Sequence, residues 1–140
     1  MGLVRKVPMN ADGLKDFAQR YATAWGSQNA ASVAAFYEEK ASLRINAGPP
    51  SVGQVAITTA AQSFMTAFPD MVVFLDDVSF LGDNAIFRWT LVGTNTGPSG
   101  TGKPVRISGY EEWKLGENGL IGESKGHFDE ADYQRQLNEK

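Results

Sequence analysis

Hydrophobic residues change their spacing halfway along the chain, from a helical period to the alternation of β-strands. Residues 71–128 contain four β-rich runs, and the first two are separated by Gly82, Asp83 and Asn84. Strands joined by such short turns pair antiparallel, so this half of the chain predicts a four-stranded meander.

Helical spacing dominates the first half of the sequence. Apolar residues three and four positions apart predict a helix over residues 14–25, which Asp12 caps and Gly26 ends. A short second helix is expected to begin at Asn29, with Tyr37 on its buried side.

The remaining elements follow from the same two periods. Residues 41–46 alternate as a single strand, and helical spacing then runs from residue 57 until Pro69 stops it. A last short helix is predicted over residues 130–137. The expected order is two helices, a strand, a helix, four strands and a helix.

Composition limits the number of domains and the classes of partner. With 140 residues, 42% of them hydrophobic, we expect one domain over residues 1–140, with its core at about 11–138. The chain has no cysteine and only one histidine, His127, so we expect no metal site and no cofactor. A net charge of -3 without a basic run argues against nucleic acid. We expect a cytoplasmic protein, because no apolar run approaches the about 20 residues of a membrane span.

The segment "GPSGTGKP", residues 97–104, nearly matches a phosphate-binding loop. Such a loop joins a strand to a helix, and a hydroxyl residue follows its lysine. Here Pro104 follows the lysine, and the next residues alternate as a strand. The glycines are therefore interpreted as a wide, flexible hairpin loop.

Glu111 interrupts an otherwise apolar row of one predicted strand. Ile107, Gly109 and Trp113 share its face, so the carboxyl is expected to point inward, where it needs a partner or its pKa rises. An exposed carboxylate on a frayed or bulged strand is the alternative, and the pattern leaves both open.

Other polar residues surround this position in the expected fold. Gly122 and Gly126 lie in the same row as Ser124 and leave empty volume beside it. A pocket bordered by the helix that carries Tyr21 is therefore predicted. The pattern favours a core tyrosine with its hydroxyl at the rim for Tyr21, unless Glu111 faces it. Arg88 lies on the face opposite the apolar row of its strand, either as a pocket cation or as a solvent-facing residue.

A set of short motifs resembles a known family. The motifs "FPD", "GD", "RW", "GTNTG", "TGKPV", "NG", "FD" and "RQL" are similar to those of SnoaL-like polyketide cyclases, in the superfamily of nuclear transport factor 2, ketosteroid isomerase and limonene epoxide hydrolase. The resemblance covers residues 14–137. It implies a cystatin-like α+β cone, in which a curved, mostly antiparallel sheet wraps three helices around a deep apolar pocket. It also implies a homodimer formed through the sheet.

The functional positions of the superfamily are only partly present. The catalytic aspartate of the cyclases corresponds to Gly126, and the epoxide hydrolase set keeps Arg88 and Asn46 but lacks its two acids. Similarity to the isomerase implies that Tyr21 and Glu111 form its carbonyl-polarising pair. The isomerase base corresponds to an apolar position flanked by Arg44 and Asn46.

Three hypotheses follow from these residues. The first is a cofactor-independent cyclase or isomerase for a small apolar ketone, with Glu111 as acid/base and Tyr21 as hydrogen-bond donor. The second is a non-catalytic binder of an apolar metabolite, and the third is a dimerisation module with a vestigial pocket. The substrate-binding candidates are Arg88, Asn46, Trp113, Ser124 and Arg44.

Overall fold

The computed structural model describes residues 10–138 as one mixed sheet with four helices. The helices are α1 (Ala11–Trp25), α2 (Ala30–Ala34), α3 (Gln54–Ala67) and α4 (Glu130–Asn138). The strands are β1 (Tyr37–Ile45), β2 (Ser51–Val52), β3 (Val72–Leu81), β4 (Asn84–Thr94), β5 (Pro104–Leu115) and β6 (Ile121–Phe128). This is the predicted α+β order with the short strand β2 added.

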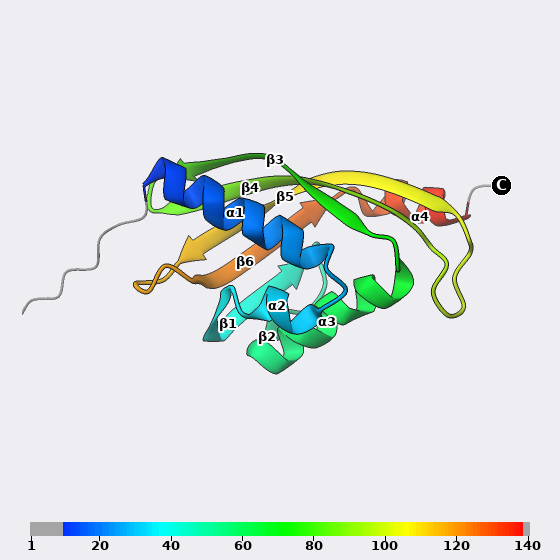
Figure 1. Ribbon diagram of the computed structural model, residues 1–140, viewed down its shortest axis with the longest axis horizontal. Coiled ribbons are helices and arrows are strands. Elements are labelled where there is room, and N and C mark those ends of the chain that lie inside the picture. The colour runs from blue at the N-terminus through cyan, green and yellow to red at the C-terminus, as the bar shows by residue number, and fades with distance from the viewer. Residues whose placement is uncertain (1–9, 139–140) are drawn as a thin grey trace, which may run out of the picture.

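The sheet has the strand order β2-β1-β6-β5-β4-β3. Its neighbours pair antiparallel except β1 and β6, which run parallel. In Figure 1 the sheet curves around the helices, with α1 lying along β3 and with α2 and α3 beside β1 and β2. The predicted curved, mostly antiparallel sheet around three helices is confirmed, and its concave side faces the core.

Alternation along the strands selects the side chains of that core. The row of β5 that contains Glu111 is buried at Val105, Ile107 and Trp113, while the opposite row faces outward. From α1, the buried stripe contributes Leu14, Phe17, Ala18, Tyr21, Ala22 and Trp25. Helix and sheet therefore meet through their apolar faces, as the two periods predict.

Two boundaries in the first half were predicted wrongly. The cap of α1 is Asn10 and not Asp12, because the Asn10 Oδ1 accepts a hydrogen bond from the Gly13 N–H at 2.7 Å. Tyr37 does not belong to α2, which ends at Ala34; it begins β1, where it pairs with Ile121 of β6. This pairing joins segments distant in sequence, so it overrides the local helical spacing.

The glycine-rich segment connects two strands, β4 and β5. Gly97 packs against the end of α3: its N–H donates to the Ala67 carbonyl, and a Cβ at this position would lie 1.9 Å from the Thr66 carbonyl oxygen. Asn95 fastens the loop through its side-chain amide, which donates to the Ala67 carbonyl, and its Oδ1, which accepts from Thr101. The loop is a hairpin, as predicted, and these contacts tie it to α3.

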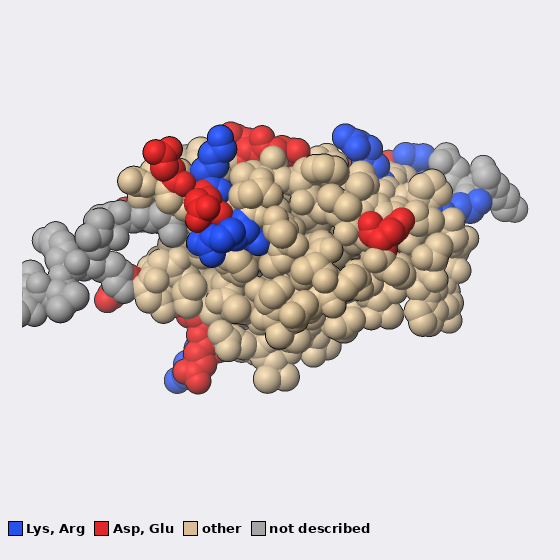
Figure 2. Space-filling view, in the orientation of Figure 1, with Lys and Arg blue, Asp and Glu red and all other residues tan. Residues whose placement is uncertain are grey.

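Charged side chains are distributed unevenly over the molecule. Residues 45–69, which include α3, contain no Asp, Glu, Lys or Arg. Figure 2 shows the charges of this face mainly over α1 and along the edges, with one separate acidic patch on the right, whereas the surface over α2 and α3 is uncharged. Within residues 10–138, no helix combines the length and the hydropathy needed to span a membrane.

Candidate functional site

Glu111 lies in the middle of β5, on the concave side of the sheet. Phe87 of β4 and Gly126 of β6 are its neighbours in register, and its side chain is only 8% exposed. The alternation of β5 thus turns this carboxyl inward, and the alternative of a water-exposed carboxylate is not what the structure has.

Three donors converge on one oxygen of this carboxyl. The Tyr21 hydroxyl donates to Glu111 Oε1 at 2.9 Å, and the Trp113 Nε1–H and the Ser124 hydroxyl each donate to it at 2.8 Å. The other oxygen, Oε2, has no hydrogen bond to any residue of the described range 10–138. The side chain is therefore held by one oxygen and leaves the second free to react or to bind.

A second buried tyrosine, Tyr37, forms a hydrogen bond with Tyr21. The hydroxyl groups of Tyr21 and Tyr37 are 2.6 Å apart, and since Tyr21 gives its single proton to Glu111, Tyr37 donates to Tyr21. Burial, followed by the nearby Glu111, raises the pKa of both phenols well above 10.0, so both stay protonated. The result is a relay of donors that ends at the carboxyl.

Burial and hydrogen bonding act on Glu111 in opposite directions. Desolvation raises its pKa and is the larger effect, while the hydrogen bonds from Trp113, Ser124 and Tyr21 lower it. The net result is a pKa above the ordinary 4.5. A carboxyl of this kind exchanges its proton closer to neutral pH, which suits an acid/base group.

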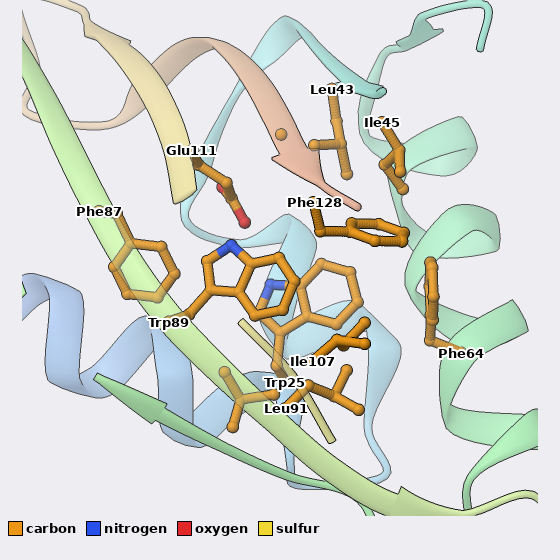
Figure 3. A pocket seen from close by; sticks show the side chains of 12 residues that line it. Trp25, Leu43, Ile45, Phe64, Phe87, Trp89, Leu91, Ile107, Glu111 and Phe128 are labelled. Atoms are coloured by element: carbon orange, nitrogen blue, oxygen red, sulfur yellow. The ribbon is translucent and has the colours of Figure 1, made fainter. Parts of the chain in front are cut away.

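A cavity of about 60 Å³ lies directly next to this carboxyl. Figure 3 shows the carboxyl of Glu111 pointing toward a ring of aromatic and aliphatic side chains. Glu111 is the only ionisable residue among those that the structure describes as its lining. These are Trp25, Leu43, Ile45, Phe64, Val73, Phe87, Trp89, Leu91, Ile107, Glu111, Gly126 and Phe128. An apolar cavity with one polar group is typical of a small-molecule site.

Gly126 keeps part of this cavity empty. It pairs with Glu111 across β5 and β6, and a Cβ there would lie 3.7 Å from Glu111 Cγ, an ordinary contact distance. The backbone therefore tolerates a side chain, and its absence leaves volume in front of the carboxyl. This is the position to which the resemblance assigns the cyclase aspartate, so the described cavity lacks that acid.

The predicted site residues fall into two groups. Tyr21, Trp113 and Ser124 meet at Glu111, but none of them lines the cavity. Their contact is with the buried oxygen of the carboxyl and not with the space in front of it. They are positioning residues in this structure, whereas the sequence suggested direct contact of Tyr21, Trp113 and Ser124 with a ligand.

The second group lies away from the cavity. Arg88 is exposed on the convex face and its guanidinium lies 5.5 Å from the ring centroid of Tyr110. Arg44 is also exposed, and Asn46 fixes a turn, with a φ of 51° and an Oδ1 that accepts from the Phe128 N–H at 2.9 Å. We therefore leave these three residues out of the site, because their strand positions or local contacts direct them elsewhere.

Sequence reasoning missed Tyr37 and the two tryptophans of the cavity. Tyr37 was hidden by its assignment to α2. The position of Trp89 could have been inferred from Gly109. The two residues pair in the sheet, and a Cβ at Gly109 would lie 2.7 Å from Trp89 Cζ2. A glycine opposite a tryptophan on a concave sheet indicates that the indole folds over its neighbour, toward the row of Glu111.

Comparison with known families and structures identifies a matching family model and proteins of similar fold. The model of the SnoaL-like domain matches residues 18–124. A search of curated proteins finds no match.

Solved structures resemble the chain in fold at low sequence identity. A protein proposed to be a SnoaL-like polyketide cyclase, from Jannaschia sp. CCS1, is 16% identical with a TM-score of 0.79, covering 99% of both chains. A hypothetical protein with a ketosteroid isomerase-like fold from Catenulispora acidiphila DSM 44928, in complex with trimethylamine, is 12% identical with a TM-score of 0.77, covering 87% of this chain and 92% of the other. An NTF2-like protein of unknown function from Burkholderia pseudomallei K96243 is 15% identical with a TM-score of 0.75, covering 89% and 96%.

Proposed function

Because this chain belongs to the SnoaL-like domain family, we propose that it binds a small, mainly apolar carbonyl compound and exchanges a proton with it through Glu111. One observation carries the proposal: a buried carboxyl with a raised pKa keeps one oxygen without a partner beside an apolar cavity. Perturbed carboxyls in cavities are characteristic of acid/base sites.

The proposed step is enolisation. The ionised Glu111 takes a proton from the carbon next to the carbonyl through Oε2, and the electron pair of that C–H bond moves to the carbonyl oxygen. Returning the proton to the same or another carbon regenerates the carboxylate and gives exchange or isomerisation. The three donors on Oε1 support this role, because they stabilise the carboxylate inside an apolar environment.

Cavity size favours a small substrate. The volume of about 60 Å³ is several times the about 10–15 Å³ that one water molecule requires. It is well below the about 150 Å³ of an engineered core cavity that takes up benzene. A multi-ring polyketide or steroid therefore requires large movements of the lining side chains. Cyclopentanone, which is close to benzene in size, requires smaller movements, and acetone requires the least.

A non-catalytic binder is the second candidate, and it too rests on a specific observation. Glu111 has no second acid or base beside it among the described residues that line the cavity, and Gly126 stands where the cyclases carry theirs. A site with one ionisable group polarises or fixes a carbonyl without a separate proton acceptor. The same cavity then senses or stores its ligand.

Hydrogen exchange at the α-carbon of a ketone separates the two candidates. Acetone and cyclopentanone in D2O are the probes, and NMR follows both the loss of the α-proton signal and the binding. We expect the protein to accelerate exchange and Glu111→Gln to lose the acceleration by at least about a hundredfold, the usual range for one acid/base group. Binding of the ketone should stay within about threefold, because glutamine keeps an acceptor for the three donors.

Glu112→Gln is the matched control. Glu112 is the next residue of β5, is exposed, and has its Oε2 2.7 Å from His127 Nε2 on the other face of the sheet. The Glu112→Gln protein should therefore accelerate exchange of the ketone α-proton as much as the unmodified protein does. Ketone binding without acceleration in the unmodified protein would instead favour the non-catalytic binder.

The homodimer that the family resemblance implies remains a prediction. The convex face of the sheet does carry apolar surface at its edge strand, where Val72 is 45% and Phe74 is 49% exposed. This surface supports a proposal of pairing through the sheet. The proposed cytoplasmic location likewise remains a prediction.

A further inference from the structure

Two buried indole groups in the cavity wall have no hydrogen-bond acceptor. Trp25 and Trp89 are each only 8% exposed, and neither Nε1–H has a partner among the described residues. The third tryptophan, Trp113, differs because its Nε1–H donates to Glu111. Buried donors are nearly always satisfied in native proteins, so two unsatisfied ones in a single cavity require an explanation.

Both indoles border the same cavity as the carboxyl of Glu111. Trp25 comes from α1 and Trp89 from β4, and both line the cavity together with Glu111. In Figure 3 both indole nitrogen atoms are drawn on the side of their rings that faces Glu111 in this view, the nitrogen of Trp89 nearer to it than that of Trp25. An interaction with the Trp25 side chain lowers the pKa of Tyr21, against the larger effect of burial, so this indole lies close to the polar cluster.

We propose that the Nε1–H groups of Trp25 and Trp89 bind the carbonyl oxygen of the ligand. This inference rests on the proposed function, because it specifies how the ligand of the same cavity is recognised. A carbonyl oxygen has two lone pairs and accepts two N–H donors, which is what the two indoles supply. An indole N–H donates only, so these two groups select a ligand that presents an acceptor atom to them.

The same donors also suit the proposed chemistry. Enolisation moves negative charge onto the carbonyl oxygen, and donors that are fixed beforehand in a water-poor cavity stabilise that charge. Tyr21 cannot do this in the present geometry, because its proton is used by Glu111 behind the cavity wall. The indoles thus take the role that the sequence had suggested for the tyrosine. The expected ligand class is a small ketone or aldehyde with an apolar body.

The indole region of the 1H–15N NMR spectrum tests this proposal directly. The chain has three tryptophans and hence three Nε1–H signals, which Trp25→Phe and Trp89→Phe assign. Cyclopentanone is the carbonyl probe, and cyclopentane is the hydrocarbon control of the same ring size. We expect cyclopentanone to move the Trp25 and Trp89 signals downfield, as new hydrogen bonds do, and cyclopentane to leave them without a downfield shift. The Trp113 signal should stay in place with both, because its N–H remains on Glu111.

Affinity gives a second and independent readout. Each Trp→Phe variant keeps an aromatic ring but removes one donor, and it changes the cavity volume for both probes alike. The preference for cyclopentanone over cyclopentane should therefore fall about three- to tenfold in each variant, the usual effect of one neutral hydrogen bond. Should a variant not fold, the shifts of the unmodified protein still decide the question.

The outcomes distinguish this inference from the function on which it rests. Equal binding of both probes, with no indole shift specific to the ketone, overturns the acceptor site and leaves a cavity for apolar ligands. Indole shifts without α-proton exchange support the acceptor site and contradict enolisation. If neither probe binds, both proposals are wrong.

Discussion

Replacing Glu111 with leucine is expected to lower the free energy of unfolding by about 3–5 kcal/mol, as breaking a buried polar network typically does. Leucine fills much of the same volume but leaves Tyr21, Trp113 and Ser124 with buried donors and no acceptor. Chemical denaturation at neutral pH, followed by tryptophan fluorescence, measures the loss. The residue that we place in the site is thus also a central structural element of this fold.

Glutamine provides the matched comparison at this position. Glu111→Gln retains an oxygen for the three donors, so we expect it to cost less than about 1.5 kcal/mol, within the range of one altered hydrogen bond. A leucine variant as stable as the glutamine variant would show that the donors find other partners or water. The hydrogen-bond network around Oε1 would then not determine where the carboxyl points.

Filling the space at Gly126 is expected to weaken ketone binding strongly. In Gly126→Val, two methyl groups enter the cavity in front of Glu111, and overpacking of this size weakens binding by at least about tenfold. Stability should change by less than about 1.5 kcal/mol, because valine suits a strand and part of its side chain occupies empty volume. Titration with cyclopentanone, observed by NMR, measures the affinity.

Gly126→Ala is the graded control for this variant. A Cβ at this position meets the Arg44 carbonyl oxygen at 3.5 Å and Glu111 Cγ at 3.7 Å, so it fits without displacement. Its effect on affinity should lie between those of glycine and valine. Unchanged binding in Gly126→Val would mean that the ligand occupies a different part of the molecule.

The sequence predicts the central features of the site because they depend on local periodicity. Alternation along β5 turns Glu111 toward the core, and the helical spacing of α1 turns Tyr21 toward the same core. These two rules, with the antiparallel meander, suffice to bring the two residues together. Register between neighbouring strands then places Gly126 opposite the carboxyl.

The rest depends on contacts that no local pattern contains. The rotation of the Glu111 carboxyl decides whether a neighbouring side chain contacts Oε1 or the cavity, and the sequence does not contain this rotation. The sequence therefore predicted that Trp113 and Ser124 contact the ligand, whereas in the structure they donate hydrogen bonds to Glu111. Tyr37 joins the relay because β1 pairs with β6, which is distant in sequence. The free N–H groups of Trp25 and Trp89 follow from packing alone.

The raised pKa of Glu111 also predicts how the free energy of unfolding changes with pH. The folded protein holds this proton more tightly than the unfolded chain, so the contribution of Glu111 is fully present below its ordinary pKa of 4.5. It is lost as the pH rises through the higher folded pKa. Glu111→Gln has no such group, and its stability relative to the unmodified protein should therefore increase across that range.

Titration of the Glu111 side-chain carboxyl by 13C NMR, with Glu111→Gln to assign the signal, tests most directly whether a buried acid faces the cavity. We expect a midpoint above 4.5, and a further rise in Tyr21→Phe, because the hydrogen bond from Tyr21 lowers this pKa. Cyclopentanone should shift the midpoint, since it binds next to the free oxygen. A midpoint at or below 4.5 that does not respond to the ketone would contradict the site described above.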